Sequence, residues 1–463
     1  MNFTTEFTKL EKSQMRLSVT VKQEEVKNSY AALTAKYAKQ LQLPGFRKGK
    51  VPIKILEQKF GESLRAETSN EVVESVLKEI FESVQAEQRP LPYAAPKLED
   101  VAELSLEADF VFAVVYDIMP VFSLEKISGF TIEIPEVKIS DGDIQKELLS
   151  LQERNALITD CSDTVAAEKG LIATLNLVEL DEAGNEKADT KQNGYVFTLG
   201  SEYSHYDIND DVIGMKKNEE KTVVKSYPAD YQRKEYAGTT KTIRVTLTAL
   251  KKRDLPAIDD DLAQDVSEKY KTLADLKAAI AKSLTVKIED ELEKEKVQSL
   301  LTQIVESNPF ELPESMVMAE LEGRWSMLAE QMRISVEQLE NLTSVLQNGK
   351  RKADIFQDWR ADAELHLKKG LVLQKLLSNR EITVSSEEVE AEYAYIAERR
   401  DINLDEVKKH YADDVREREY LIDSLKEKKL YTQLFAQSSV KTGAAVSVDK
   451  FFGKEMDDAG KDA

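Results

Sequence analysis

The sequence predicts a multidomain α+β protein. A sheet with a long helical hairpin comes first, then a small antiparallel β domain, then an all-helical C-terminal domain. Three observations predict this order. Apolar residues alternate and then recur at helical spacing up to about residue 118, residues 171–250 hold short strand-like runs, and long charged amphipathic segments follow residue 256. A chain of 463 residues is also too long for one hydrophobic core.

The N-terminal part is predicted to form a sheet from which a hairpin of two helices extends. Alternation of apolar and polar residues predicts a half-buried strand over 15–21, and further strands are predicted over 110–116 and 130–134. The first helix is predicted by apolar residues three and four apart, namely Val26, Tyr30, Leu33, Tyr37 and Leu41. Pro44 and Gly45 end it, and a second helix begins near Pro52 with the stripe Ile53, Leu56, Phe60 and Leu64.

The remainder divides into a β-rich and a helical part. Strands are predicted over 171–180, 195–199, 221–226 and 242–250, separated by glycine-containing turns. Helices are predicted over 141–158, 273–305, 316–332, 355–377, 389–400 and 414–436. The domain boundaries predicted are therefore 1–118, a linker over 119–158, the β domain over 159–253, the helical domain over 254–440, and a frayed or disordered tail over 441–463.

Composition excludes several classes of function. A formal net charge of −21 argues against general binding to nucleic acid or to membranes. His205, His366 and His410 lie far from one another and from Cys161, the single cysteine, so we expect no metal site. The sequence holds no P-loop, dinucleotide fingerprint or G-x-S-x-G motif, and we expect no cofactor. The N-terminus shows no signal peptide and no apolar run is long enough to span a membrane, so we expect a cytoplasmic protein.

A short basic island interrupts this acidic chain at the predicted apex of the hairpin. It reads Gly45-Phe46-Arg47-Lys48-Gly49-Lys50-Val51-Pro52, and no Asp or Glu occurs between Glu25 and Glu57. Charge alone fits two interpretations, a solvated turn or a site for an anionic partner. Phe46 favours the binding site, because an apolar side chain at a loop tip is stabilised only when a partner covers it.

A cluster of methionines in the helical part indicates a second binding surface. Met316, Met318, Met327 and Met332 lie close together in the sequence with Trp325, and flexible thioether side chains suit a surface that adapts to many partners. The alternative interpretation is ordinary packing between helices. Long charged helices with few large apolar residues cannot all bury a full face, so some apolar stripe should line a groove.

The stretch from Leu43 to Pro52 strongly resembles the ribosome-docking signature of the trigger factor family of bacterial nascent-chain chaperones. That signature is G-F-R-x-G-K-x-P at the tip of a helical hairpin, and every fixed position is present here. The resemblance covers nearly the whole chain, since the family has an α+β docking domain, an FKBP-like β domain and a helical C-terminal domain. The run 308–313, Asn-Pro-Phe-Glu-Leu-Pro, also resembles the family's C-terminal region.

The resemblance implies an ATP-independent chaperone on the large ribosomal subunit at the tunnel exit. The tip residues Gly45, Phe46, Arg47, Lys48, Gly49, Lys50 and Pro52 would contact a ribosomal protein and adjacent rRNA. The helical domain would shield nascent and unfolded polypeptides, with Met316, Met318, Met327 and Met332 as client-binding candidates, and the free protein could form a homodimer.

The resemblance also implies a peptidyl-prolyl isomerase, but the expected pocket departs from the family pattern. The family's V/I-x-G-W/F-E-x-G stretch falls on residues 205–211, where Ile208 replaces the aromatic floor and Asp207 a glycine. The first-strand aromatic is Asn176, and the last-strand aromatic is Ile243. The candidate pocket residues are Tyr195, Phe197, Ile208, Tyr231, Tyr236 and Ile243. Because a dry aromatic wall lowers the barrier to amide rotation, we expect the activity to be weak or absent.

Two rival functions stay open from the sequence. One is a free FKBP-like prolyl isomerase with helical substrate-binding extensions, whose basic tip is incidental. The other is an envelope chaperone, which would need a signal peptide. Co-sedimentation with ribosomes separates a docking chaperone from both.

Overall fold

The structure is a computed structural model that describes residues 1–453 apart from 42, 45, 47, 48, 50, 182, 202, 203, 229, 230, 232–235, 347–350 and 401. Its contacts divide the chain into two compact units, and each unit is built from two separate stretches of sequence. The first unit comprises Met1–Ile134 and Glu293–Thr442, and the second comprises Pro135–Leu292 and Gly443–Ala463. The predicted α+β class with a helical C-terminal part is confirmed.

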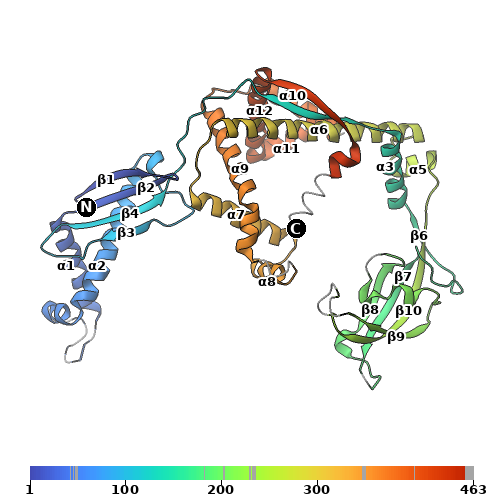
Figure 1. Ribbon diagram of the computed structural model, residues 1–463, viewed down its shortest axis with the longest axis horizontal. Coiled ribbons are helices and arrows are strands. Elements are labelled where there is room, and N and C mark those ends of the chain that lie inside the picture. The colour runs from blue at the N-terminus through green and yellow to red at the C-terminus, as the bar shows by residue number, and fades with distance from the viewer. Residues whose placement is uncertain are drawn as a thin grey trace. The chain divides into compact units, whose positions relative to one another are not determined.

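An antiparallel sheet and a helical hairpin form the beginning of the first unit (Figure 1). The sheet has the order β1-β2-β4-β3, with β1 (Phe3–Leu10), β2 (Gln14–Val21), β4 (Phe110–Asp117) and β3 (Lys97–Val101). Helices α1 (Gln23–Gln40) and α2 (Ile53–Ser83) run side by side away from it. The predicted alternation is confirmed, because Met15, Leu17, Val19 and Val21 of β2 are all buried in the core of this sheet.

The segment predicted as a linker packs against the helices of the C-terminal part. Phe130 and Ile132 are buried, together with residues of the second half of α6 (Leu273–Ser307), α9 (Lys352–Ser378) and α12 (Val415–Ala436). Ile132 lies in β5 (Thr131–Lys138), whose alternation the sequence predicted. Residues 122–134 are therefore part of a core, because their apolar side chains have a helical surface to cover.

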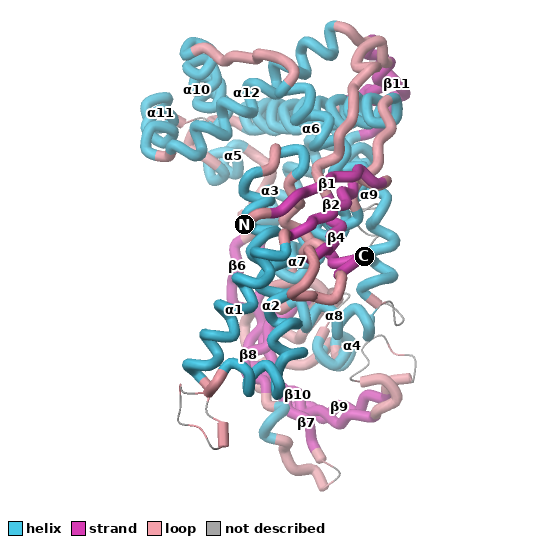
Figure 2. The backbone as a smooth tube through the Cα atoms, turned by 90° about the vertical axis from the view of Figure 1, so that its left-hand side faces the viewer, coloured by secondary structure: helices cyan, strands magenta, loops and turns pink. Residues whose placement is uncertain are grey.

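The other helices of the first unit form two groups. α7 (Glu314–Gln331) and α8 (Val336–Leu346) share a core with α9 around the buried Trp325. α10 (Ser386–Arg400), α11 (Leu404–Asp413) and α12 share another around Tyr393, and Figure 2 shows these three helices together.

The second unit contains the β domain and a short helical layer. The strands are β6 (Leu157–Asp160), β7 (Ile172–Leu180), β8 (Gln192–Thr198), β9 (Glu220–Ser226) and β10 (Thr240–Asp254), in the order β6-β10-β7-β8 with β9 also paired to β10. A short helix, α4 (Asn209–Val212), follows β8. Outside the β domain, α3 (Asp141–Arg154) buries Leu148 against α5 (Asp260–Val266) and the first half of α6.

The predicted frayed tail is wrong for residues 441–453. The chain forms β11 (Ser439–Ser447), which pairs with β5, and residues 448–453 are helical. Val448 and Phe451 are buried against Ile288, and this apolar contact fixes a segment whose small and charged residues had suggested disorder. Residues 454–463 lie outside the described part of the chain.

Two features are absent from the described part of the chain. No helix there is both long and apolar enough to cross a bilayer. No group of three or more His, Cys, Asp or Glu side chains there could hold a metal ion.

Candidate functional site

The tip of the α1–α2 hairpin displays an aromatic side chain above a small buried core. Tyr30, Val51, Leu56 and Leu64 form that core. The side chain of Phe46 is 36% exposed. Its backbone N–H donates a hydrogen bond to the carbonyl of Leu43. The tip therefore has a packed base and an apolar apex. Gly45, Arg47, Lys48 and Lys50 lie outside the described residues.

Two residues of the island set the path of the chain. Gly49 has a φ of +77°, which disfavours L side chains, and a Cβ atom there would lie 3.3 Å from the carbonyl oxygen of Lys39. Pro52 is the N-cap of α2, and its carbonyl accepts hydrogen bonds from the N–H groups of Ile55 and Leu56. The motif thus needs glycine and proline here to bend the chain back into α2.

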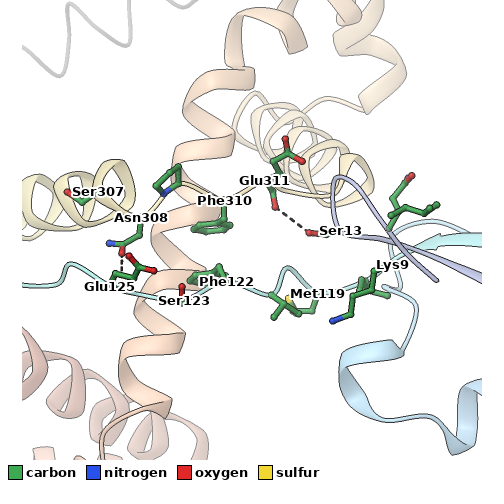
Figure 3. A pocket seen from close by; sticks show the side chains of 15 residues that line it. Lys9, Ser13, Met119, Phe122, Ser123, Glu125, Ser307, Asn308, Phe310 and Glu311 are labelled. Atoms are coloured by element: carbon green, nitrogen blue, oxygen red, sulfur yellow. Dashed lines mark hydrogen bonds between the residues drawn. The ribbon is translucent and has the colours of Figure 1, made fainter. Parts of the chain in front are cut away.

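A second feature of the first unit is the neck, defined here as residues 118–126 and 307–311. These two stretches line a cavity of about 590 Å³ together with the β1–β2 turn (Figure 3). Phe122 stacks on Phe310 with ring centroids 4.0 Å apart. Glu311 accepts a hydrogen bond from the Lys12 N–H through its carboxylate, and one from the Ser13 hydroxyl through its carbonyl.

Asn308 joins the two stretches of the neck. Its Oδ1 accepts from the N–H groups of Glu125 and Lys126, at 2.7 and 3.1 Å. Its Nδ2 donates to the carbonyls of Lys126 and Ile304, at 2.7 and 2.8 Å. These four bonds use the full capacity of a buried amide side chain, so the run 308–313 noted in the sequence has a structural role at this joint.

The methionine candidates separate into buried and exposed residues. Met316 is 5% exposed, so its packing is internal. Met318, Met327 and Met332 are 38%, 59% and 45% exposed. The structure thus favours ordinary packing for the first residue and leaves the other three on the surface of α7 and its C-terminal end.

In the β domain, the candidate pocket residues share one core. Phe197, Ile208, Tyr236 and Ile243 are buried in it, and Tyr195 and Tyr231 pack against it. Two further aromatics that the sequence did not single out, Tyr206 and Tyr227, complete the cluster. The rings of Tyr206 and Tyr236 lie 5.4 Å apart, and those of Tyr227 and Tyr236 lie 5.1 Å apart.

Comparisons with known proteins agree over nearly the whole chain. The family model "Bacterial trigger factor protein (TF)" matches residues 1–151, and "Bacterial trigger factor protein (TF) C-terminus" matches residues 272–436. The trigger factor of Treponema denticola is 46% identical over 450 residues, covering 97% of this chain and 99% of that one. The trigger factor of Treponema pallidum is 36% identical over 455 residues, covering 98% and 99%.

The chain belongs to the trigger factor family. A solved structure described as "Promiscuous Substrate Recognition in Folding and Assembly Activities of the Trigger Factor Chaperone" covers 93% of this chain and 99% of its own, with 20% identity and a TM-score of 0.44. Trigger factors are ribosome-associated chaperones, and this chain is one by its family. The family also carries a prolyl isomerase domain.

In this trigger factor family member, a buried carboxylate lies beside the aromatic cluster. Glu179 accepts hydrogen bonds from the Tyr206 hydroxyl at 3.2 Å and from Lys241 Nζ at 3.0 Å. Burial alone would raise the pKa of Glu179, but the bonds from Lys241 and Tyr206 outweigh it and hold that pKa below its usual value. Burial, followed by the charge of Glu179, raises the pKa of the Tyr206 hydroxyl.

The sequence offered little signal for this network. Glu179 stands in a strand among apolar residues, and an acidic residue at such a position is a weak sign of a buried ion pair. Tyr206 has a φ of +57° and Asp207 a φ of +55°, a conformation that no spacing rule predicts for these residue types.

Proposed function

We propose that the hairpin tip docks this chaperone on the large ribosomal subunit at the tunnel exit, in the cytoplasm. The observation that carries this proposal is the exposed Phe46 above the buried base of Val51, Leu56 and Leu64. Arg47, Lys48 and Lys50 would neutralise phosphate or acidic side chains while Phe46 fills an apolar site. An otherwise acidic chain would be repelled from rRNA elsewhere.

Client binding is assigned to the helical surface around α7. Met318, Met327 and Met332 offer exposed, flexible apolar side chains, while Met316 is too buried to take part. The chain would hold nascent and unfolded polypeptides through several weak apolar contacts, without ATP. We also propose that the chain forms a homodimer when it is not bound to a ribosome.

The β domain would keep the family's fold with weak or absent isomerase activity. Tyr206, Tyr227 and Tyr236 are buried, and the ring of Tyr236 packs against the rings of the other two. A catalytic pocket must instead leave apolar walls free for the twisted amide of the substrate. Family membership disfavours the rival function of a free prolyl isomerase.

The docking proposal is tested with the triple variant Phe46→Ala, Arg47→Ala, Lys48→Ala. Because the tip lies outside the main core, the variant should keep its thermal stability and lose at least about tenfold in affinity for ribosomes, in a salt-dependent manner. The measurement is co-sedimentation with salt-washed 70S ribosomes at two salt concentrations.

A matched control removes two positive charges from the end of the hairpin away from the tip, as Lys27→Ala in α1 with Lys78→Ala in α2. Both side chains are exposed. The control should sediment with ribosomes as the unmodified chain does. Undiminished binding of the triple variant to ribosomes would contradict docking through the tip.

A further inference from the structure

Two cavities of the first unit share a wall on α7. The larger, of about 700 Å³, lies between the start of α7 and the ends of β2, β3 and β4. The smaller, of about 460 Å³, lies between α7 and α9. Met318 and Glu322 line both. The two cavities therefore adjoin, and Met318 is the exposed apolar side chain where they meet.

Ion pairs hold α7 and α9 on either side of the smaller cavity. Lys352 Nζ lies 2.7 Å from the Glu322 carboxylate, and Arg360 forms two hydrogen bonds to Glu314. These bonds raise the pKa of Arg360 and lower that of Glu314, so both groups keep their charges. Between the pairs lies Phe356, with Lys352 Nζ 5.2 Å from its ring centroid. The smaller cavity is thus apolar inside with a charged rim.

The larger cavity includes the first residue of an edge strand. β3 is the last strand in the order β1-β2-β4-β3, and all five of its residues are exposed. Among the described residues, its main chain pairs with β4 on one side and with no strand on the other. Lys97, at the start of β3, lines the cavity, together with Tyr93, which is 51% exposed. Such an edge can accept an added strand.

A carboxylate in the larger cavity has only neutral hydrogen-bond donors around it. Asp117 accepts from the side-chain amide of Gln14 at 2.9 Å and from the N–H of Ser315 at 3.1 Å. No ion pair to Asp117 occurs within the described part of the chain. A lysine or arginine of a bound segment would match this charge.

We propose that these cavities form one track for an extended segment of an unfolded polypeptide. The segment pairs its main chain with the free edge of β3, sets a basic side chain toward Asp117, and packs apolar side chains on either side of Met318. Alternate side chains of an extended chain point the same way about 6.6–7 Å apart, which suits a row of shallow cavities. The inference rests on the proposed client-holding function and gives it a location and a binding geometry.

The test uses the full chain and three fluorescently labelled twelve-residue peptides, read by fluorescence anisotropy. The first alternates leucine with polar residues and carries two lysines. The second has glutamates in place of the lysines, and the third is the first with its main chain N-methylated at alternate residues, which removes strand pairing. The first peptide should bind at least about fivefold more tightly than either of the others.

Three variants locate the site. Met318→Ser should weaken binding of the lysine peptide about tenfold, whereas Val336→Ser should change it less than twofold. Val336 is the matched control because it is an apolar residue of the neighbouring helix α8, is as exposed as Met318 at 38%, and lines neither cavity. Asp117→Asn keeps a hydrogen-bond acceptor for Ser315 and should bring the lysine and glutamate peptides to nearly equal affinity.

The outcomes separate this inference from the function on which it rests. If the unmodified chain binds the peptides but Val336→Ser weakens binding as much as Met318→Ser, the track is wrong and client contacts are diffuse. Equal affinity for the N-methylated peptide would likewise overturn strand pairing. If the unmodified chain binds no peptide and fails to suppress aggregation of an unfolded protein, the client-holding function itself fails, and the track with it.

Discussion

Glu179 is a buried carboxylate that keeps its charge because Lys241 and Tyr206 donate to it. Since its pKa in the folded protein lies below that of the unfolded chain, its contribution to stability is present above the unfolded-state pKa and is lost as the pH falls through the folded-state pKa. The β domain should therefore lose stability in acid partly through this residue.

Replacing Lys241 tests this network. Lys241→Met leaves Glu179 buried without its main partner, and should lower the free energy of unfolding of the β domain by about 3 kcal/mol at neutral pH. The loss should shrink in acid, where the carboxylate is protonated in both states. Hydrogen exchange of residues 172–180 by mass spectrometry measures it.

The control is Lys217→Met, which breaks an exposed ion pair with Asp163 and should cost little stability, because solvent screens such a pair. If both variants lose the same free energy of unfolding at pH 7, the buried network stabilises the β domain no more than an exposed ion pair does.

At the scale of single residues, local sequence patterns predict some features of the structure and fail to predict others. The buried alternation of Met15 to Val21 and the glycine at position 49 follow from local rules, namely strand periodicity and a φ that favours glycine. Met316 and Met318 are two residues apart on one helix, yet one is buried and one exposed. Composition cannot separate them, because tertiary packing decides which of the two side chains is covered.

At the scale of elements, long periodic segments were predicted well, and strands without an apolar alternation of their own were missed. The predicted helix 355–377 is α9, Lys352–Ser378. β1 was missed because only Phe3 and Phe7 along it pack against the core. Apolar residues four positions apart do not produce the alternation that predicts a strand. β11 and the residues after it were missed because their order comes from β5 and from Ile288, distant in sequence.

The aromatic cluster of the β domain supports a prediction about catalysis. The full chain should isomerise a proline peptide at least about tenfold more slowly than an ordinary FKBP-like domain. A tenfold lower rate corresponds to an activation free energy higher by ~1.4 kcal/mol. Exchange NMR of the peptide measures this without a protease. An FKBP-like domain assayed alongside is the control, and turnover equal to it would refute an eroded pocket.

At the scale of the whole molecule, the β domain enters and leaves through neighbouring strands. Leu157 of β6 pairs with Asp254 of β10, so the residues on either side of the domain lie close together. Strands in such a pair are about 5 Å apart, and a two-residue linker can replace the domain.

Removal of residues 157–254 should therefore leave the rest folded and active as a holdase. The client surface proposed here lies on α7, outside the deleted part, so suppression of aggregation of an unfolded model protein should stay within about twofold. Circular dichroism confirms folding, and the Met318→Ser change in the shortened chain serves as a negative control. A folded deletion variant without holdase activity would contradict this division of roles.

The packing of Phe130 and Ile132 against α12 has a consequence for how the chain is made. These side chains leave the ribosome about 300 residues before Leu430 and Leu434, which help to bury them. At 5–20 residues per second, they wait roughly 15–60 s for these two partners, the last buried residues of their core to be made. During its own synthesis, this chaperone therefore presents the kind of apolar segment that it shields in other chains, and a copy already on the ribosome would be the first protein to meet it.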